Sequence, residues 1–278
     1  MWVGAGWPSH GVGLRSAAGA PVRIVTAEGE RPVGDVDRAR APEQVHEGAS
    51  YLHQGQHWRV VELDLDVGVA RVEPDDGATY TVARRDTQIR LADVDATRTV
   101  GRACLHLGAA EVHTTVVGYQ RKDALTGAVV HSEALELPTA TLVTRAIWYV
   151  VGHDVVAAAG LDRARLPGAL HAIEHAAIGM LPLFAICDRW DVGGVSTAHQ
   201  VDTERPTIVI YDAMPGGAGV AELGFEAADR HLGATVERVR ACGCTEGCPS
   251  CIQSPKCGNA NDHLDKAAAV ALLEALLP

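Results

Sequence analysis

Five of the seven cysteines lie close together near the C-terminal end of the sequence, in a pattern that suits a metal ion. The spacing is C-x-C-x3-C-x2-C-x5-C, formed by Cys242, Cys244, Cys248, Cys251 and Cys257. Four thiolates complete the tetrahedral coordination of Zn²⁺, and such closed sites are structural because they leave no position for water or substrate. We expect one structural zinc ion on Cys242, Cys244, Cys248 and Cys251, with Cys257 as the alternate ligand, and no catalytic residue in this chain.

Redox chemistry and iron–sulfur ligation are the alternatives at the same cysteines. A redox C-x-x-C pair, here Cys248 and Cys251, belongs at the start of a helix in a βαβ unit, whereas these residues lie in a loop rich in glycine and proline. An odd total of cysteines argues against a disulfide framework. Cys104 and Cys187 lie among apolar residues and are more typical of a protein core than of a metal site.

A second motif, H-x-x-E-H, is formed by His171, Glu174 and His175 and matches the inverted motif of zinc peptidases. On a helix the two histidines share one face and bind a metal ion, while the glutamate activates water. A pattern this short also arises by chance, and its residues then pack in the core or form local hydrogen bonds. We favour this second interpretation and keep a metallopeptidase as an alternative function.

Three aspartates form the other candidate catalytic set. Asp188, Asp191 and Asp212 could gather around Mg²⁺ at strand ends, and such a group of carboxylates would be typical of a nuclease. The competing interpretation is that they stabilise turns and helix ends, with Asp212 closing a strand before a glycine turn. Spacing alone does not bring the three together, so a metal-dependent nuclease stays an alternative.

The sequence contains no loop that could cradle the phosphates of ATP. Such a loop needs Gly-Lys-Ser/Thr after a strand, and the three lysines, Lys122, Lys256 and Lys266, follow Arg121, Pro255 and Asp265 instead. The glycine turn at residues 215–219 separates a predicted strand from a predicted helix, but it does not match G-x-G-x-x-G and is better explained as a close-packed turn. ATP hydrolysis is therefore not expected from this chain.

Contacts with nucleic acid must come from local basic residues. The formal net charge is −11, so the surface as a whole repels phosphate. The basic residues beside Tyr80 and Tyr119, together with one in the cysteine-rich segment, are the candidates, although such residues more often belong to a solvated face than to a DNA contact. These predicted DNA contacts are Arg84, Arg85, Arg90, Arg121, Lys122 and Lys256.

The elements that must position these residues divide the chain near residue 138. Short alternating or β-branched runs broken by Gly, Asp and Pro predict small antiparallel sheets or a barrel at residues 21–138. Helical periodicity follows at residues 140–159 and 167–181, then a buried strand at residues 207–211, and a last helix from about Asp262. The expected fold is α+β: a linker at 1–20, a β-rich, small-barrel-like domain at 21–138, and a mixed α/β zinc-binding domain at 139–278 that ends in the zinc loop and a C-terminal helix.

Composition indicates a folded chain. Hydrophobic residues make up 47% and charged residues 21%, which is ordinary globular usage. The longest nearly apolar stretch, residues 176–187, is too short to span a bilayer. We expect a cytoplasmic monomer that does not bind membranes.

Four segments carry a resemblance to a known family. They are residues 168–177 (GALHAIEHAA), 187–196 (CDRWDVGGVS), 211–219 (YDAMPGGAG) and 247–259 (GCPSCIQSPKCGN). In this order they resemble the C-terminal zinc-binding domain of superfamily 2 DEAD/DEAH DNA helicases of the mitomycin-repair type, which are related to a RecQ-like fungal helicase. Residues 14–89 resemble the region that follows the motor domains in that family.

The resemblance implies ATP-dependent 3′–5′ DNA unwinding and a part in DNA repair for the full-length parent protein. It implies that this chain guides the DNA strand leaving the motor and braces the motor domains. The partners are then single-stranded DNA and the RecA-like motor domains of the parent helicase.

Overall fold

The computed structural model describes residues 20–277, so the linker predicted at residues 1–20 lies, except for its last residue, outside the described part. The chain forms two compact units. Unit 1 comprises the residues up to Asp86 and Thr114–Ala140, and unit 2 comprises Thr87–His113 and the residues from Thr141 onward. The units alternate along the chain because two long strands, β6 (Thr79–Val100) and β7 (Ala103–Asp123), contribute residues to both. The boundary near residue 138 stays a prediction.

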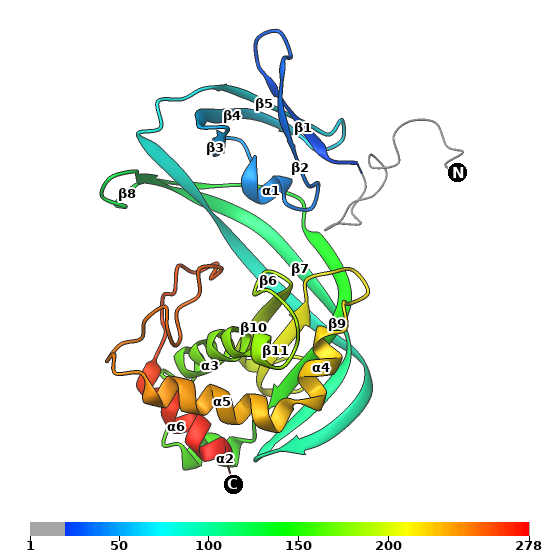
Figure 1. Cartoon of the computed structure of the whole chain (residues 1–278), viewed down its shortest axis with the longest axis vertical. Helices are drawn as coiled ribbons and strands as arrows, with labels where there is room; N and C mark the ends of the chain where they lie inside the picture. The colour runs from blue at the N-terminus through cyan, green and yellow to red at the C-terminus, as the bar shows by residue number, and fades with distance from the viewer. Residues whose placement is uncertain (1–19, 278) are drawn as a thin grey trace, which may run out of the picture. The chain divides into compact units, whose positions relative to one another are not determined.

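Unit 1 is built on a small five-stranded sheet (Figure 1). Its strand order is β2-β1-β5-β4-β3, with β1 and β5 parallel and the other neighbours antiparallel. Alternate side chains of the strands, such as Val22 and Ile24 of β1, are fully buried in one core with Trp58. The elements are β1 (Val22–Thr26), β2 (Pro32–Val36), α1 (Ala41–Gln44), β3 (Ser50–His53), β4 (Gln56–Asp64), β5 (Val69–Pro74) and β8 (Val129–Ala134), which pairs with β7.

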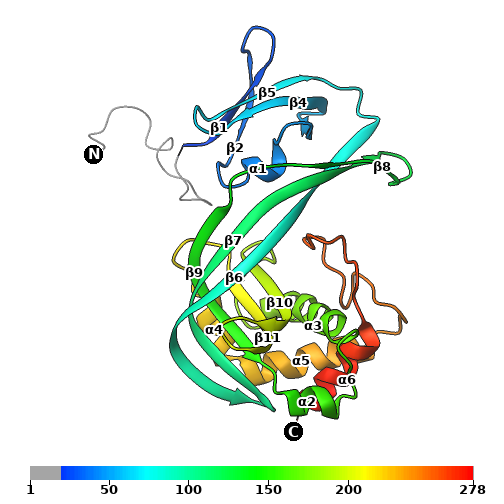
Figure 2. The same cartoon turned by 180° about the vertical axis from the view of Figure 1, so that it is seen from behind.

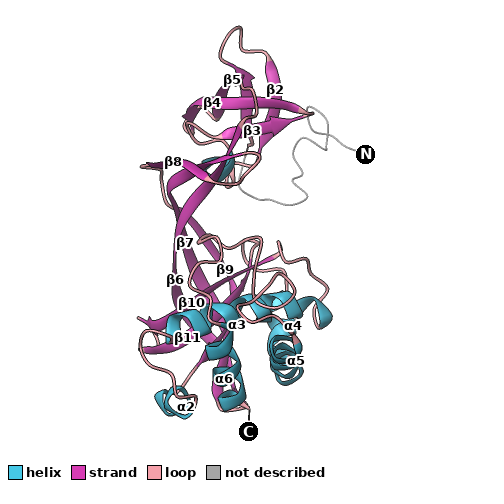
Figure 3. Ribbon diagram, turned by 90° about the vertical axis from the view of Figure 1, so that its left-hand side faces the viewer, coloured by secondary structure: helices cyan, strands magenta, loops and turns pink. Residues whose placement is uncertain are grey.

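Unit 2 combines strands with most of the helices (Figure 3). Its strands follow the order β10-β11-β9-β7-β6. Helix α3 contacts β10, β11, α5 and α6, and so links the sheet to the helical layer. The elements are β9 (Ala140–Val150), α2 (His153–Ala158), α3 (Leu166–Met180), a 3₁₀ turn (Leu181–Leu183), β10 (Val192–Gln200), β11 (Arg205–Asp212), α4 (Val220–Glu226), α5 (Ala228–Ala241) and α6 (Lys266–Leu276).

The helix predicted at residues 140–159 is wrong for residues 140–150 and is confirmed only near its end. The structure has strand β9 there, followed by the short helix α2. The second half of strand β9 is buried on both faces: Ile147 and Tyr149 pack in the core beneath the helices, whereas Ala146 and Trp148 pack in a separate core on the other face. A strand that is apolar on both faces lacks the polar alternation of a half-exposed strand, so its run of apolar residues was mistaken for part of a helix.

The other predicted elements of unit 2 are close to those observed. The helix at 167–181 corresponds to α3, and the strand at 207–211 lies within β11. The last helix begins at Lys266, later than predicted, because the Asp265 side chain caps it by accepting a hydrogen bond from the backbone N–H of Ala268 at 2.8 Å. The α+β fold class is confirmed, with a small-barrel-like β-rich part and a mixed part that ends in the cysteine loop and α6.

No helix within residues 20–277 is long and apolar enough to cross a membrane.

A buried tyrosine in β9 leads to the first testable prediction. The Tyr149 hydroxyl is buried and has no hydrogen-bond partner among the described residues. Tyr149→Phe should therefore raise the free energy of unfolding by about 1 kcal/mol, because a buried hydroxyl without a partner loses its hydrogen bonds to water and gains none in the protein. Urea denaturation of the purified chain measures this change.

The matched control is a tyrosine whose hydroxyl is used. Tyr119 is equally buried, and its hydroxyl donates to the Glu133 carboxylate at 2.6 Å. Tyr119→Phe should lower the free energy of unfolding by about 1 kcal/mol. If both variants lose the same stability, the Tyr149 hydroxyl has a partner after all.

Candidate metal centre

The loop between α5 and α6 brings the first four cysteines of the cluster together. Their sulfur atoms all lie within 4.8 Å of one another. Neighbouring Sγ atoms are 3.6 Å apart for Cys242 and Cys244, and 3.5 Å apart for both Cys242–Cys248 and Cys244–Cys251. The Cys248–Cys251 separation is 3.8 Å. We call these residues the four-cysteine cluster.

These distances fit a tetrahedral zinc ion. A Zn–S bond of about 2.3 Å in tetrahedral geometry places the sulfur atoms about 3.8 Å apart. A disulfide would require about 2.05 Å, and the cysteines are free thiols in the structure. The donor set and its dimensions therefore suit one Zn²⁺ ion in a closed, structural site.

Short turns shape the loop around the sulfurs. The backbone N–H of Cys251 donates to the carbonyl oxygen of Cys248 at 2.9 Å, and the N–H of Cys248 points at the Cys251 sulfur, 3.3 Å away. Gly247 has a φ of +108°, and a Cβ atom there would lie 2.5 Å from the Ile252 side chain, so this turn requires glycine. Ile252 is fully buried in the core of unit 2 and anchors the loop to it.

A buried lysine lies against the same cluster. The Lys266 ammonium donates to the carbonyl oxygens of Cys242 at 2.6 Å and Cys244 at 2.5 Å, and lies 3.3 Å from the Cys244 sulfur. Burial disfavours its charge, but the hydrogen bond to Cys244 and the nearby thiolates outweigh burial and raise the pKa of Lys266. Because four thiolates around Zn²⁺ leave an excess of negative charge, this cation stabilises the occupied site.

The thiols themselves have divergent acidities. Hydrogen bonds, first from the Cys244 backbone and then from neighbouring thiols, lower the pKa of Cys242 to about 6, whereas burial raises the pKa of Cys251 to about 12. Four adjacent thiolates repel one another, so only a bound cation allows all of them to ionise at neutral pH.

Cys257 does not join the four-cysteine cluster. It lies with His171 and His175 of α3, and the ligand atoms of these three residues are within 4.8 Å of one another. Burial lowers the pKa of His171 to about 4 and also lowers the pKa of His175, so both imidazoles are neutral at physiological pH. The structure therefore contains a second group of potential metal ligands.

Glu174, the acidic residue of the H-x-x-E-H motif, points toward β10 and not toward Cys257. The buried Glu174 carboxylate accepts a hydrogen bond from the Ser196 hydroxyl of β10 at 2.7 Å, and burial raises its pKa to about 7. Gly194 makes room for it, since a Cβ atom there would be 2.6 Å from the Glu174 carboxylate. Because Glu174 is hydrogen-bonded to Ser196 and buried against β10, it is not placed as the water-activating base that an inverted zinc peptidase requires.

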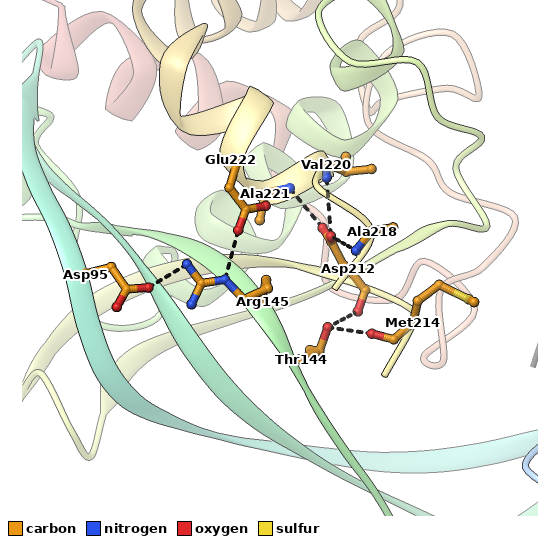
Figure 4. A network of polar contacts seen from close by, with 9 residues as sticks. All are labelled: Asp95, Thr144, Arg145, Asp212, Met214, Ala218, Val220, Ala221 and Glu222. Atoms are coloured by element: carbon orange, nitrogen blue, oxygen red, sulfur yellow. Dashed lines mark hydrogen bonds and ion pairs between the residues drawn. The ribbon is translucent and has the colours of Figure 1, made fainter. Parts of the chain in front are cut away.

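The Asp212 side chain accepts hydrogen bonds from the backbone N–H groups of the glycine turn and of the start of α4 (Figure 4). Its buried carboxylate accepts the backbone N–H groups of Ala218 at 2.5 Å, Val220 at 3.2 Å and Ala221 at 2.9 Å. Burial raises the pKa of Asp212, and these three donors oppose that shift. The N–H groups at the start of α4 are thus satisfied within the chain, as the close-packed-turn interpretation requires.

Arg145, which lies beside the glycine turn, links the turn to neighbouring elements. Arg145 forms ion pairs with Asp95 at 2.5 Å and with Glu222 of α4 at 2.8 Å (Figure 4). Gly217, with a φ of +92°, lies against the stem of Arg145, where a Cβ atom would be 2.3 Å from the arginine Cγ. Strand β9, the turn and α4 are therefore joined by one polar network.

The three aspartates of the nuclease alternative do not form a metal site. Asp191 accepts the backbone N–H of Asp188 at 2.7 Å, and Asp188 accepts that of Trp190 at 2.9 Å, so both stabilise a turn. With Asp212 engaged at α4, no group of potential metal ligands among residues 20–277 contains these three carboxylates. The turn-and-cap interpretation accounts for all of them.

The predicted DNA-contact residues fall in both units. Arg84, Arg85, Arg121 and Lys122 belong to unit 1, and Arg90 and Lys256 to unit 2. Arg84 and Arg90 are exposed. Three others make internal contacts. Arg85 pairs with the Glu43 carboxylate at 3.3 Å, and Arg121 donates to the Gly48 carbonyl at 2.7 Å. Lys256 donates to the Val192 carbonyl at 2.6 Å and lies over the Trp190 ring. Their binding to DNA stays a prediction.

The fold and the four-cysteine cluster define this chain as a zinc-binding domain. The family model of the MrfA Zn-binding domain matches residues 173–252, from the middle of α3 to the residue after Cys251. A protein of Methanocaldococcus jannaschii, itself uncharacterised, is 40% identical over 111 residues, which cover 39% of this chain and 99% of that protein. The chain belongs to the MrfA Zn-binding domain family.

Longer relatives are helicases by name. The uncharacterised ATP-dependent helicase YprA of Bacillus subtilis is 32% identical over 256 residues, covering 90% of this chain and 34% of YprA. A crystal structure of the DUF1998 helicase MrfA bound to DNA matches 99% of this chain and 36% of that chain, with a TM-score of 0.65 and 29% identity. This chain spans about a third of the length of these helicases.

Sequence analysis missed two parts of the site. The sequence gives Lys266 no role beyond its absence from a phosphate-binding motif, whereas the structure sets it at the start of the last helix and beside the cysteines. The contact between Cys257 and His171 joins residues far apart in the chain. The cysteine run and the H-x-x-E-H motif are both visible in the sequence. Nothing in their spacing indicates that Cys257 and His171 lie together.

Proposed function

We propose that this chain is the C-terminal accessory region of an ATP-dependent 3′–5′ DNA helicase that acts in DNA repair in the cytoplasm. The observation that carries this proposal is the family match, which spans α3 to the four-cysteine cluster. The names of the longer relatives add support, since YprA is called an ATP-dependent helicase and MrfA was crystallised with DNA. The motor domains would lie on sequence outside this chain.

Within that protein, we propose that Cys242, Cys244, Cys248 and Cys251 hold the structural zinc ion. Their sulfur separations and the buried Lys266 cation support this assignment. A closed site has no open position for chemistry, so the zinc would serve to fix the loop between α5 and α6. The chain would then guide single-stranded DNA and brace the RecA-like motor domains, and would act as a monomer.

The exposed arginines of β6 are the best candidates for contact with the DNA backbone. Arg84 and Arg90 are exposed on β6, whereas Arg85, Arg121 and Lys256 already make internal contacts. A chain with a net charge of −11 must bind phosphate through such local sites. Base stacking would contribute little, because aromatic residues make up only 4% of the sequence.

The proposal is tested by titrating labelled single-stranded DNA into the purified chain. Arg84→Ala and Arg90→Ala should each weaken binding about 3- to 10-fold at low salt, equally for different sequences. Each should also reduce the salt dependence of binding by roughly one ion, since one phosphate contact is lost. Fluorescence anisotropy at several salt concentrations measures both effects.

The control is Arg163→Ala, which removes an exposed arginine that was not predicted to contact DNA. It should leave the affinity and its salt dependence nearly unchanged. Equal losses in all three variants would indicate a nonspecific effect of net charge. Wild-type affinity in the Arg84 and Arg90 variants would remove these residues from the DNA path.

A further inference from the structure

The cluster formed by His171, His175 and Cys257 has the composition and dimensions of a metal site. The two histidines stand one turn apart on the same face of α3, with ring centroids 4.3 Å apart. The Cys257 sulfur approaches them from the loop that leads to α6 and lies 3.5 Å from Nε2 of His171. We call these three residues the His2Cys cluster.

The separation of these atoms matches coordination to a common ion. Zn–N bonds of about 2.05 Å and a Zn–S bond of about 2.3 Å in tetrahedral geometry place the nitrogen and sulfur about 3.6 Å apart. All three ligand atoms lie within 4.8 Å of one another. Two imidazoles and a thiolate together favour Zn²⁺ and similar borderline ions over Mg²⁺ or Ca²⁺.

A hydrogen bond orients His175 and fixes which of its ring nitrogens is free to bind a metal. Nδ1 of His175 lies 2.8 Å from the carbonyl oxygen of Ile252. A carbonyl oxygen only accepts, so Nδ1 carries the hydrogen and Nε2 keeps its lone pair for a ligand. Such a hydrogen bond from the free ring nitrogen to a carbonyl is the usual support of a metal-binding histidine.

The loop is held close to α3 at the same place. The backbone N–H of Asp265 donates to the carbonyl oxygen of Gly168 at 3.2 Å, and a Cβ atom on Gly168 would lie 2.6 Å from the His263 carbonyl. Asn261 bridges the other side of the turn, with its side-chain oxygen 2.7 Å from the Ser254 N–H. The position of Cys257 opposite the histidines is thus built into the packing of the loop on α3.

We propose that His171, His175 and Cys257 bind a second divalent metal ion of the Zn²⁺ class, separate from the ion of the four-cysteine cluster. Three protein ligands leave one coordination position for water. Glu174, the residue that would activate such a water in a peptidase, is engaged with Ser196. The second ion therefore fastens the loop to α3 and leaves an exchangeable position.

The two metal centres would be connected through one residue. Ile252 follows Cys251 of the four-cysteine cluster, and its carbonyl oxygen is the partner of His175 in the His2Cys cluster. Loss of either ion would then loosen the same buried residue. Both ions would act together to hold residues 242–265 in place.

The test is the zinc content of the purified chain, prepared without chelators, incubated with excess ZnCl₂, and desalted. Inductively coupled plasma mass spectrometry should find two zinc ions per wild-type chain. His171→Gln and Cys257→Ser should each reduce the content to one, and Cys251→Ser should remove the other ion. Cys187→Ser, which changes a cysteine outside both groups, should retain two.

The decisive contrary result is a single zinc per wild-type chain that His171→Gln and Cys257→Ser leave unchanged. This result would overturn the second site and leave the four-cysteine site intact, so the two proposals fail separately. Wild-type stoichiometry decides the matter even if a variant folds poorly. Near-UV circular dichroism of His171→Gln checks that the loss of one ion is not a loss of fold.

Discussion

Cys251→Ser is expected to abolish zinc binding at the four-cysteine cluster and to lower the melting temperature by roughly 10 °C. Cys251 is the most buried of the four, and its sulfur lies close to those of Cys244 and Cys248. Losing one of four thiolates leaves three charged or protonated groups without their ion. We expect a loss of at least about 3 kcal/mol, because the free energy of metal binding in a closed site is largely free energy of folding.

The structure also indicates which region depends on the zinc. Residues 242–265 contain no helix or strand, so the metal, the buried Ile252 and a small number of hydrogen bonds order them. Helix α6 follows this loop and places Ala268, Leu272 and Leu273 in the core of unit 2. Loss of the ion should therefore free the loop first and weaken the docking of α6, while the sheet and α3 keep their own packing.

Differential scanning fluorimetry and hydrogen exchange measure these effects. The Cys251→Ser variant should show faster exchange in residues 242–277 than in β9 or β11. Cys187→Ser is the matched control, because it also replaces a partly buried cysteine but lies outside both ligand groups. An unchanged melting temperature in Cys251→Ser, or an equal fall in both variants, would contradict a structural role for the zinc.

The zinc cluster was predictable because its geometry is local. Spacers of one to three residues between Cys242, Cys244, Cys248 and Cys251 force the sulfurs into one small volume, whatever the rest of the fold does. Cys257 lies only a few residues further on, yet the packing of its loop on α3 turns it toward His171. No spacing rule foresees a contact between residues that are 86 positions apart.

The error in β9 has a comparable origin. Sequence periodicity reports which face of an element meets water, and β9 has two buried faces near Ile147 and Trp148. The half-exposed strands of unit 1, such as β4 with buried Trp58 and Val60, alternate clearly and belong to the region for which the sequence predicts small sheets. Where tertiary packing covers both sides, composition has to decide: β11, also buried on both faces at Ile208 and Val209, is predictable as a strand from its run of β-branched residues, whereas β9 is not.

Asp212→Ala is expected to lower the free energy of unfolding by about 3 kcal/mol, through loss of the cap at the start of α4. The substitution removes the acceptor of three backbone N–H groups, two of which are buried with the carboxylate. Each buried donor left without a partner loses about 1 kcal/mol or more. The Thr144 hydroxyl lies 2.8 Å from the backbone carbonyl oxygens of both Asp212 and Met214, shares its one hydrogen between them and ties β9 to the turn, so it should lose much of its fixed geometry as well.

Asp212→Asn separates the acceptor from the charge. The amide oxygen can replace Oδ2, which accepts from Ala218 and Val220, but the amide nitrogen then faces the N–H of Ala221. We expect roughly half the loss of the alanine variant, measured by urea denaturation monitored at the tryptophans. Asp191→Ala, which removes an exposed carboxylate with a single turn hydrogen bond, should cost less than about 1 kcal/mol. A loss in Asp212→Ala as small as in Asp191→Ala would mean that the turn holds its shape without this carboxylate, and its N–H groups would then be available to an anion.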